Sequence, residues 1–179
     1  MLKYAHTMYK KLKIMTKLKY YCQLTRINKP IGILLLLWPT LWALFIASNG
    51  KPNIILIIVF TVGVFLMRSG TVAINDYADV DFDRDVERTK NRVLVHGLIS
   101  KKNAVLLGVM LSIIAFIMAL VFLKITTILM CIPAFIIAMT YPLMKRFFIF
   151  PQLYLGVAYS FGILMAFVEI QNNIPLVGW

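Results

Sequence analysis

The chain has 179 residues, of which 61% are hydrophobic, and its mean hydropathy is +0.84. A soluble domain of this length needs far less apolar side chain, so the composition excludes an ordinary soluble protein and predicts one embedded in a bilayer. A net charge of +12 would suggest a nucleic-acid ligand in a soluble protein, but here the basic residues gather in the segments between apolar runs, which argues against nucleic acid as a partner.

A basic, amphipathic segment covers the first 30 residues. Its positively charged residues are Lys3, Lys10, Lys11, Lys13, Lys17, Lys19, Arg26 and Lys29. The segment lacks the short apolar core and small-residue cleavage site of a signal peptide. We therefore expect residues 1–30 to remain in the protein and to lie along the membrane surface.

Five apolar runs follow, and they predict an all-α membrane domain of about five transmembrane helices over residues 31–170, with a short tail at 171–179. The expected spans are residues 31–48, 54–74, 104–123, 125–140 and 153–170. Trp38 and Trp42 share a face of the first span, and we expect them to pack against a neighbouring helix or an apolar ligand.

The second span contains one arginine, Arg68, which is costly in hydrocarbon, at roughly 2.5–3.5 kcal/mol near the centre, and therefore needs a partner. It precedes Asn75 and Asp79 by about two and three helical turns, so it shares their face if the helix continues. We expect Arg68 to pair with the acids or with a bound phosphate, and snorkelling to the interface is the plainer alternative.

An acidic motif, NDYADVDFD, occupies residues 75–83 at the end of this span. On a continuing helix Asn75, Asp76, Asp79 and Asp83 share one face, where like charges repel by roughly 0.2–0.5 kcal/mol per pair. Oxygen ligands at this spacing suit Mg²⁺, which is usually completed by water and substrate phosphates. The motif therefore predicts a Mg²⁺-bridged phosphate site, with all four residues as metal ligands and the three aspartates as catalytic residues.

Two other interpretations of the motif are available. A solvated acidic loop that balances nearby bases is common, although these acids begin in the last apolar turn, where ionisable groups usually have a function. An EF-hand loop that starts at Asp79 fails, because Arg84 stands where the turn glycine belongs and Lys90 where the bidentate glutamate belongs.

The polar stretch at residues 77–102 is the one loop long enough to hold chemistry. Within it, Arg88 and Arg92 are four residues apart and could form a phosphate-binding pair. A solvated, positively charged loop explains these two arginines almost as well.

The distribution of basic residues predicts the orientation of the chain. Apart from Arg68, eight occur up to Lys29, six in the loop after the second span and two after the fourth, against Lys51 and Lys124 on the other side. The positive-inside rule therefore predicts that the N-terminal segment and the acidic motif face the cytoplasm.

Several ordered motifs resemble those of the UbiA prenyltransferases, and the similarity extends over about residues 24–167. The motifs are LLLLWPTLWA at 34–43, LMR at 66–68, NDYADVDFD at 75–83, Arg88-Thr89 with Asn91-Arg92, and YPLMKR at 141–146. The resemblance implies the N-terminal half of an all-helical bundle in a bacterial-type inner membrane.

The resemblance also implies an activity. Family enzymes use Mg²⁺, held by two aspartate-rich motifs, to bind polyprenyl diphosphate, and they join its chain to the ring of 4-hydroxybenzoate in ubiquinone biosynthesis. Matched by position, the first of these motifs is the acidic motif above. The expected substrate-binding residues are Asn75, Arg68, Arg88, Arg92, Lys145 and Arg146.

One departure from the family pattern is large. Family members have about nine spans and a second aspartate-rich motif, whereas the only acid after Glu87 in this sequence is Glu169. We therefore expect one of two outcomes. The chain is an enzyme whose remaining helices come from a second polypeptide or from sequence beyond Trp179, or it is an inactive truncated fragment that binds without turnover.

Overall fold

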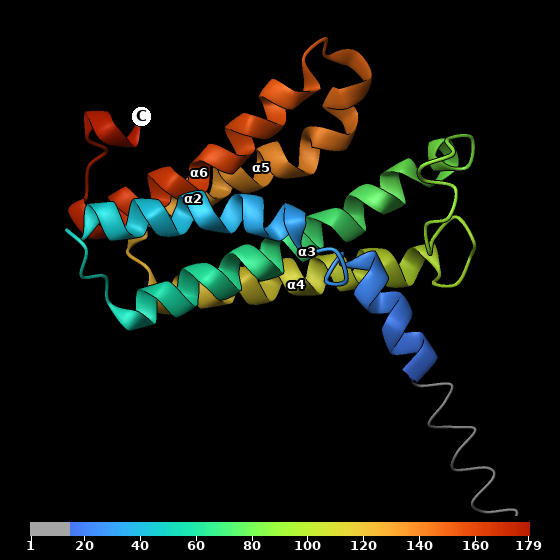
Figure 1. Ribbon diagram of the computed structural model, residues 1–179, viewed down its shortest axis with the longest axis horizontal. Coiled ribbons are helices and arrows are strands. Elements are labelled where there is room, and N and C mark those ends of the chain that lie inside the picture. The colour runs from blue at the N-terminus through green and yellow to red at the C-terminus, as the bar shows by residue number, and fades with distance from the viewer. Residues whose placement is uncertain (1–14) are drawn as a thin grey trace, which may run out of the picture.

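The computed structural model describes residues 15–179, and its regular elements are all helices (Figure 1). They are α2 (Ile31–Ala47), α3 (Ile54–Asp83), α4 (Lys101–Phe122), α5 (Ile125–Phe147), α6 (Pro151–Gln171) and the 3-10 helix η1 (Leu176–Gly178), with a further helical stretch at residues 15–24. Helices α3 to α6 are long and apolar enough to cross a membrane, and α2 is a shorter apolar helix. The expected all-α membrane class is confirmed. The first part of the expected surface segment, with Lys3, Lys10, Lys11 and Lys13, lies outside the described residues.

Consecutive helices run in opposite directions, so every second connection lies at the same end of the bundle (Figure 1). We call the end that holds residues 24–30, 84–100 and 148–150 the basic end, and the end that holds residues 48–53 and 123–124 the opposite end. The positively charged segments of the sequence therefore gather at one end. The side of the membrane that each end faces stays a prediction.

Helix α3 is the longest element, with 30 residues and a length of about 45 Å. At its start, the Asn53 side chain accepts a hydrogen bond from the Ile55 amide at 2.8 Å, which satisfies one of the free donors of the first turn. The helix then continues beyond the expected end of the span at residue 74, passes through the acidic motif and ends at Asp83, so the connection to α4 covers residues 84–100 and is shorter than the expected loop at 77–102. The motif is therefore presented by a rigid element.

Helices α3 and α4 approach each other through small residues. The buried residues of α4 recur every three or four positions and are Ala104, Gly108, Ser112, Ala115 and Ala119. A Cβ atom at Gly108 would lie 2.9 Å from the Gly70 carbonyl oxygen and 2.5 Å from Cγ1 of Ile74, so α4 has no room for a side chain there. Small residues of this kind let helices pack by van der Waals contact in lipid, where apolar burial gives little driving force.

Helix α6 ties α2 to the rest of the bundle at the opposite end. The Gln171 side-chain amide donates a hydrogen bond to the Ala47 carbonyl at 2.9 Å, and Phe167 packs with Ala43 and Leu44 in a buried apolar cluster. This contact fixes α2, whose other end leads into the basic end.

Two further details differ from the sequence-based expectations. The fourth apolar run is part of a longer helix, because α5 continues through Pro142 to Phe147. Proline removes a single amide donor, which interrupts but need not end a helix inside a bundle. Trp38 and Trp42 do not pack closely against a neighbouring helix of the described chain, since 53% and 63% of their surfaces are exposed, and the other expected partner, an apolar ligand, stays a prediction.

Candidate functional site

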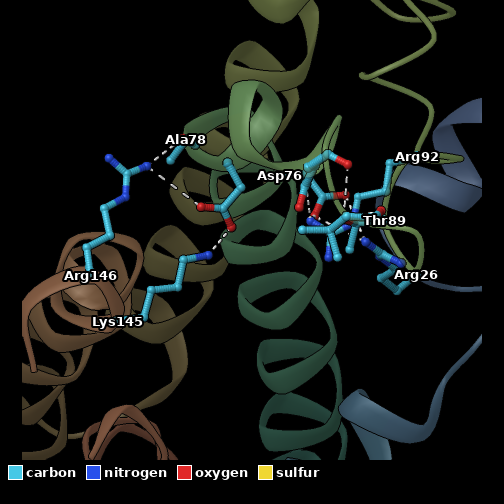
Figure 2. Close-up of polar contacts among 10 residues, drawn as sticks. Arg26, Asp76, Ala78, Thr89, Arg92, Lys145 and Arg146 are labelled. Carbon is cyan, nitrogen blue, oxygen red and sulfur yellow. Dashed lines mark hydrogen bonds and ion pairs between the residues drawn. The ribbon is translucent and has the colours of Figure 1, made fainter. Parts of the chain in front are cut away.

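The three aspartates of the acidic motif are buried at the basic end of α3. Only 4%, 3% and 7% of the surfaces of Asp76, Asp79 and Asp83 are exposed. An isolated buried carboxylate is strongly unfavourable, so each needs a charged or hydrogen-bonding partner. The partners come from three other segments of the chain (Figure 2).

Asp76 and Asp83 share one group of partners. Arg26, which lies just before α2, donates from Nη2 to both Asp76 oxygens at 3.1 and 3.0 Å. Nη1 of Arg92 lies 3.0 Å from Oδ1 of Asp76 and also contacts the Asp83 carboxylate. The Thr89 hydroxyl donates to the Asp83 carbonyl at 3.1 Å, which fastens the loop after α3 to the end of the helix.

Asp79 has a separate group of partners from the end of α5. Lys145 forms an ion pair with one Asp79 oxygen, and Arg146 lies 3.8 Å from the other. Arg146 also donates to the Ala78 carbonyl at 2.9 Å and lies over the Phe82 ring at 4.4 Å from its centre. Figure 2 shows Lys145 and Arg146 on one side of α3, with Arg26 and Arg92 on the other.

The separation of the three aspartates into two groups with different partners follows from helix geometry. Successive residues turn by about 100°, so Asp76 and Asp83 point within about 20° of each other while Asp79 points some 40–60° away. This difference is enough to direct Asp79 to α5 and the other two aspartates to Arg26 and Arg92. The motif therefore shares a broad face, as expected, but its carboxylates reach different neighbours.

The described residues contain no group of three or more His, Cys, Asp or Glu side chains placed to hold a metal ion, so the structure does not assemble the expected four ligands. Asn75 nevertheless offers a buried oxygen, Oδ1, that has no hydrogen-bond partner and lies beside Asp76 at a cavity. An unsatisfied buried oxygen next to a carboxylate suits Mg²⁺, because water and phosphate oxygens commonly supply its other ligands.

This cavity has a volume of about 910 Å³ and runs between α2, α3, α4, α5 and α6. Its charged lining residues are Arg26, Lys29, Arg68, Asp76 and Arg92. Most of the remaining wall is apolar and includes Phe60, Met67, Phe116, Met118 and Met165. The arrangement joins a polar, mostly positive region to a long hydrocarbon-lined space.

Arg68 lies in this cavity wall, but the expectation that it pairs with the acids is wrong, because it forms no ion pair within residues 15–179. Its guanidinium lies 5.7 Å from the centre of the Tyr159 ring, and its buried Nε has no hydrogen-bond partner. Gly32 leaves space for this side chain, since a Cβ there would lie 3.1 Å from an Arg68 nitrogen. The other expected partner of Arg68, a bound phosphate, stays a prediction.

The structure does not bring Arg88 and Arg92 together as a pair at the site. Arg88 is exposed, whereas Arg92 points to Asp76 and Asp83. The loop is held in this form by the burial of Thr89, Val93 and Leu94, which face the bundle on both sides of Arg92.

Two residues of the site were not singled out from the sequence, namely Arg26 and Tyr159. Arg26 counted only as one of eight basic residues near the N-terminus, although its place four residues before Pro30 and the first span was a usable signal. Tyr159 carried no signal, because an aromatic residue in an apolar run is usually part of the packing.

A family model described as the UbiA prenyltransferase family matches residues 36–179, which is most of the chain. The chain belongs to the UbiA prenyltransferase family. The resemblance noted in the sequence motifs is thereby confirmed.

Curated relatives agree with this assignment. The chain is 51% identical over 168 residues to a 4-hydroxybenzoate octaprenyltransferase of Neisseria meningitidis, covering 94% of this chain and 56% of the relative. A 4-hydroxybenzoate octaprenyltransferase of Herminiimonas arsenicoxydans is 52% identical over 166 residues, covering 92% and 58%. The chain therefore spans somewhat more than half the length of these relatives.

Solved structures of the family share the fold. The apo structure of a UbiA homolog from Aeropyrum pernix K1 is 29% identical, with a TM-score of 0.68 over 78% of this chain and 50% of that one. A UbiA homolog from Archaeoglobus fulgidus, solved with GPP and Mg²⁺, is 19% identical, with a TM-score of 0.73 over 88% and 56%. At this identity the second likeness shows the fold alone.

Proposed function

We propose that this chain forms part of a Mg²⁺-dependent prenyltransferase that moves a polyprenyl group from polyprenyl diphosphate to the ring of 4-hydroxybenzoate in ubiquinone biosynthesis. The observation that carries the proposal is the cavity of about 910 Å³, which is charged beside Asp76 and mainly apolar elsewhere. Its two parts suit a diphosphate head group and a hydrocarbon tail. The two relatives are 4-hydroxybenzoate octaprenyltransferases, which supports this donor and acceptor class.

The proposal applies to an assembly larger than the described helices. The chain covers 56% and 58% of the two relatives, so we assign the complete activity to this chain together with the region that corresponds to the rest of them. A second polypeptide or further sequence of the same protein would supply that region. Within the chain we retain the division into a basic segment at 1–30, a membrane domain at 31–170 and a tail at 171–179.

Asn75 and Asp76 are the residues best placed to hold Mg²⁺, since one offers an unsatisfied oxygen and the other a carboxylate at the same cavity. Each of the three aspartates would have to exchange a present basic partner to bind the metal, since Asp76 is paired with Arg26 and Arg92 just as Asp79 and Asp83 are paired with their own partners. When bound, the metal neutralises charge that develops on the diphosphate leaving group.

The basic residues would bind and orient the diphosphate. Arg68 lines the cavity and has an unsatisfied Nε donor, and Arg92, Lys145 and Arg146 already lie at the motif, while Arg88 would have to turn inward from the surface. During transfer the bond between the first prenyl carbon and the diphosphate oxygen breaks, and the electron pair leaves with diphosphate. The ring carbon ortho to the phenol bonds to that prenyl carbon and then loses its proton to water. Guanidinium and ammonium groups stabilise the departing anion.

The proposed setting is a bacterial-type inner membrane, with the basic end in the cytoplasm. Four helices long enough to cross a membrane, and the collection of positive segments at one end, support this placement. A water-soluble acceptor and an anionic head group would then approach the same end.

A second candidate function is binding of the prenyl diphosphate without turnover. The observation in its favour is that residues 15–179 assemble no group of three acidic or other metal-binding side chains. Transfer of a labelled geranyl group to 4-hydroxybenzoate is measured with the 179-residue chain alone and with the chain expressed beside the remaining region of a relative. Product in either sample supports the enzyme, whereas binding of geranyl diphosphate without product in both samples supports the second candidate.

Substitution of the motif tests the site directly. Asp76→Ala and Asp79→Ala should each lower Mg²⁺-dependent prenyl transfer in membranes by roughly 10²-fold or more, because each removes a carboxylate from the site where the leaving group is stabilised. Asp81→Ala is the matched control, since Asp81 lies on the same helix but is exposed, and its ion-pair partner among residues 15–179 is the exposed Lys101. Unchanged turnover in both test variants would remove the site assignment.

A further inference from the structure

Arg26 is held in a backbone conformation that is uncommon for its residue type. Its φ angle is 61°, and the other non-glycine residues with positive φ in the described chain are two asparagines, Asn49 and Asn172. Asparagine tolerates the left-handed region, whereas arginine reaches it at a cost in free energy. Such a conformation persists only where the surrounding structure fixes the residue.

A buried apolar cluster fixes the turn that carries Arg26. Leu24 is fully buried and packs with Val80 of α3 and with Val93 of the connection between α3 and α4. The same connection carries Arg92, directly before Val93. Arg26 and Arg92 therefore belong to one packed unit at the basic end, and this unit presents two guanidinium groups to the Asp76 carboxylate (Figure 2).

The charges at this point balance only while no cation is bound. Arg26 and Arg92 together carry two positive charges, and Asp76 and Asp83 carry two negative charges. A divalent cation on the carboxylates would leave the guanidinium groups without counter-charge, next to Lys29 in the cavity wall. Planar guanidinium groups recognise phosphate oxygens especially well, because two parallel N–H donors match two oxygens.

We propose that Arg26 is a phosphate-binding residue: it holds Asp76 while the cavity is empty of ligand and transfers its hydrogen bonds to a diphosphate group that enters. The inference rests on the proposed function and adds to it a residue from outside the acidic motif. The ligand is a diphosphate, either that of a prenyl donor or the free ion. A contribution of Arg26 to binding the carboxylate of the acceptor is the competing role that the experiment tests.

Binding in the absence of metal measures this role apart from catalysis. Isothermal titration of the 179-residue chain in detergent with inorganic diphosphate, in the presence of EDTA, should show affinity about 10- to 100-fold weaker for Arg26→Gln than for the unsubstituted chain, the amount expected for lost charge-assisted hydrogen bonds. Arg26→Lys keeps the charge but not the planar fork and should be weaker by about threefold to tenfold. Lys17→Gln is the control, because Lys17 is an exposed lysine of the basic N-terminal segment, and this variant should bind diphosphate as the unsubstituted chain does.

A second pair of variants excludes a purely structural role for Arg26. Asp76→Asn removes the counter-charge of Arg26 and should tighten metal-free binding of inorganic diphosphate by severalfold, and adding Arg26→Gln should abolish that gain. Equal affinities in Asp76→Asn and in the double variant would overturn the proposal. Thermal unfolding of each variant, measured in parallel, distinguishes a loss of affinity from a loss of folded protein.

Two more ligands identify what Arg26 recognises. Geranyl diphosphate should lose affinity in Arg26→Gln by the same factor as inorganic diphosphate, and 4-hydroxybenzoate should lose none. Weakened binding of 4-hydroxybenzoate alone would overturn the proposal. If the unsubstituted chain binds neither diphosphate, the donor site proposed for this chain fails; if it binds both and Arg26→Gln binds them equally well, only the role of Arg26 fails.

Discussion

The two ends of the bundle satisfy their buried carboxylates in different ways. At the basic end, the three motif aspartates are paired with long cationic side chains from other segments of the chain. At the opposite end, Glu169 is buried and accepts hydrogen bonds from the Lys124 amide at 3.0 Å and the Thr127 hydroxyl at 2.7 Å. Glu169 thus caps the start of α5 with neutral donors.

This difference separates a buried acid whose partners are fixed by the fold from buried acids whose partners are free to move to a ligand. The amide and hydroxyl at the start of α5 cannot leave Glu169 without disturbing the helix. Arginine and lysine side chains can swing to a new anion while their backbones stay in place. Burial of an acid is therefore weak evidence of function by itself, and the mobility of its partners is the stronger criterion.

Removing the capping carboxylate should produce the largest loss of stability. Glu169→Ala leaves two buried donors without an acceptor and should lower the free energy of unfolding by about 2–3 kcal/mol. Denaturant unfolding in detergent, followed by circular dichroism, measures the change. Affinity for inorganic diphosphate should stay unchanged, in contrast to the motif variants.

Glu169→Gln is the control for this prediction, because it keeps one carbonyl oxygen as an acceptor and should lose only about 1 kcal/mol. A Glu169→Ala variant as stable as the unsubstituted chain, or one that lost diphosphate binding while keeping its stability, would contradict the distinction between the ends.

Disturbing the contact between α6 and α2 should produce the second-largest loss of stability. A Cβ at Gly162 would lie 2.3 Å from Oγ1 of Thr40, so Gly162→Ala should lower the free energy of unfolding by about 1–2 kcal/mol through overpacking. The same unfolding measurement applies. Gly156→Ala, on the same helix with no atom within 4 Å of the new Cβ, should leave the stability unchanged or raise it by up to about 1 kcal/mol.

Equal losses in the two alanine variants would show that helix propensity, and not the close approach of α6 to α2, decides the result. Adding Thr40→Ala to Gly162→Ala should restore part of the loss, because it removes the atom that the new Cβ meets.

An exposed pair at the basic end should give the smallest effect. Lys101 lies 3.3 Å from Asp81, with 49% and 71% of the two side chains exposed. Lys101→Gln should change the free energy of unfolding by less than about 0.5 kcal/mol, because water and salt screen such pairs. The same unfolding assay measures the change. A loss above about 1 kcal/mol would show that an exposed ion pair at the basic end contributes to stability as much as a buried one.

The sequence was sufficient to predict the number and order of the helices, because apolar runs of this length have few alternatives to a helix in a bilayer. It did not fix the end of α3: the expected span ended at residue 74, and continuation of the helix through the acidic motif was a condition of the shared face that the structure meets. The metal-ligand and substrate-binding assignments stay predictions, which the proposed substitutions test.

The partners of the buried charged groups could not be read from local patterns. Arg26 meets Asp76 across 50 residues, and Lys145 meets Asp79 across 66, and nothing in either neighbourhood specifies the other. Arg68 illustrates the opposite error: its position on the helix favoured an acidic partner, but it lies over the Tyr159 ring. Periodicity gives the direction of a side chain, whereas the neighbouring helix decides what it meets there.

The close contact of Gly70 with Gly108 bears on how the protein is made. Helices α3 and α4 are consecutive and pack through small residues, so they can pair in the bilayer before the ribosome has completed α5. Asp76 and Asp83 then already have their arginines, because Arg26 precedes them and Arg92 follows Asp83 by nine residues. Asp79 pairs with Lys145, which is synthesised later, so Asp79 is the last of the three motif aspartates to gain its ionic partner.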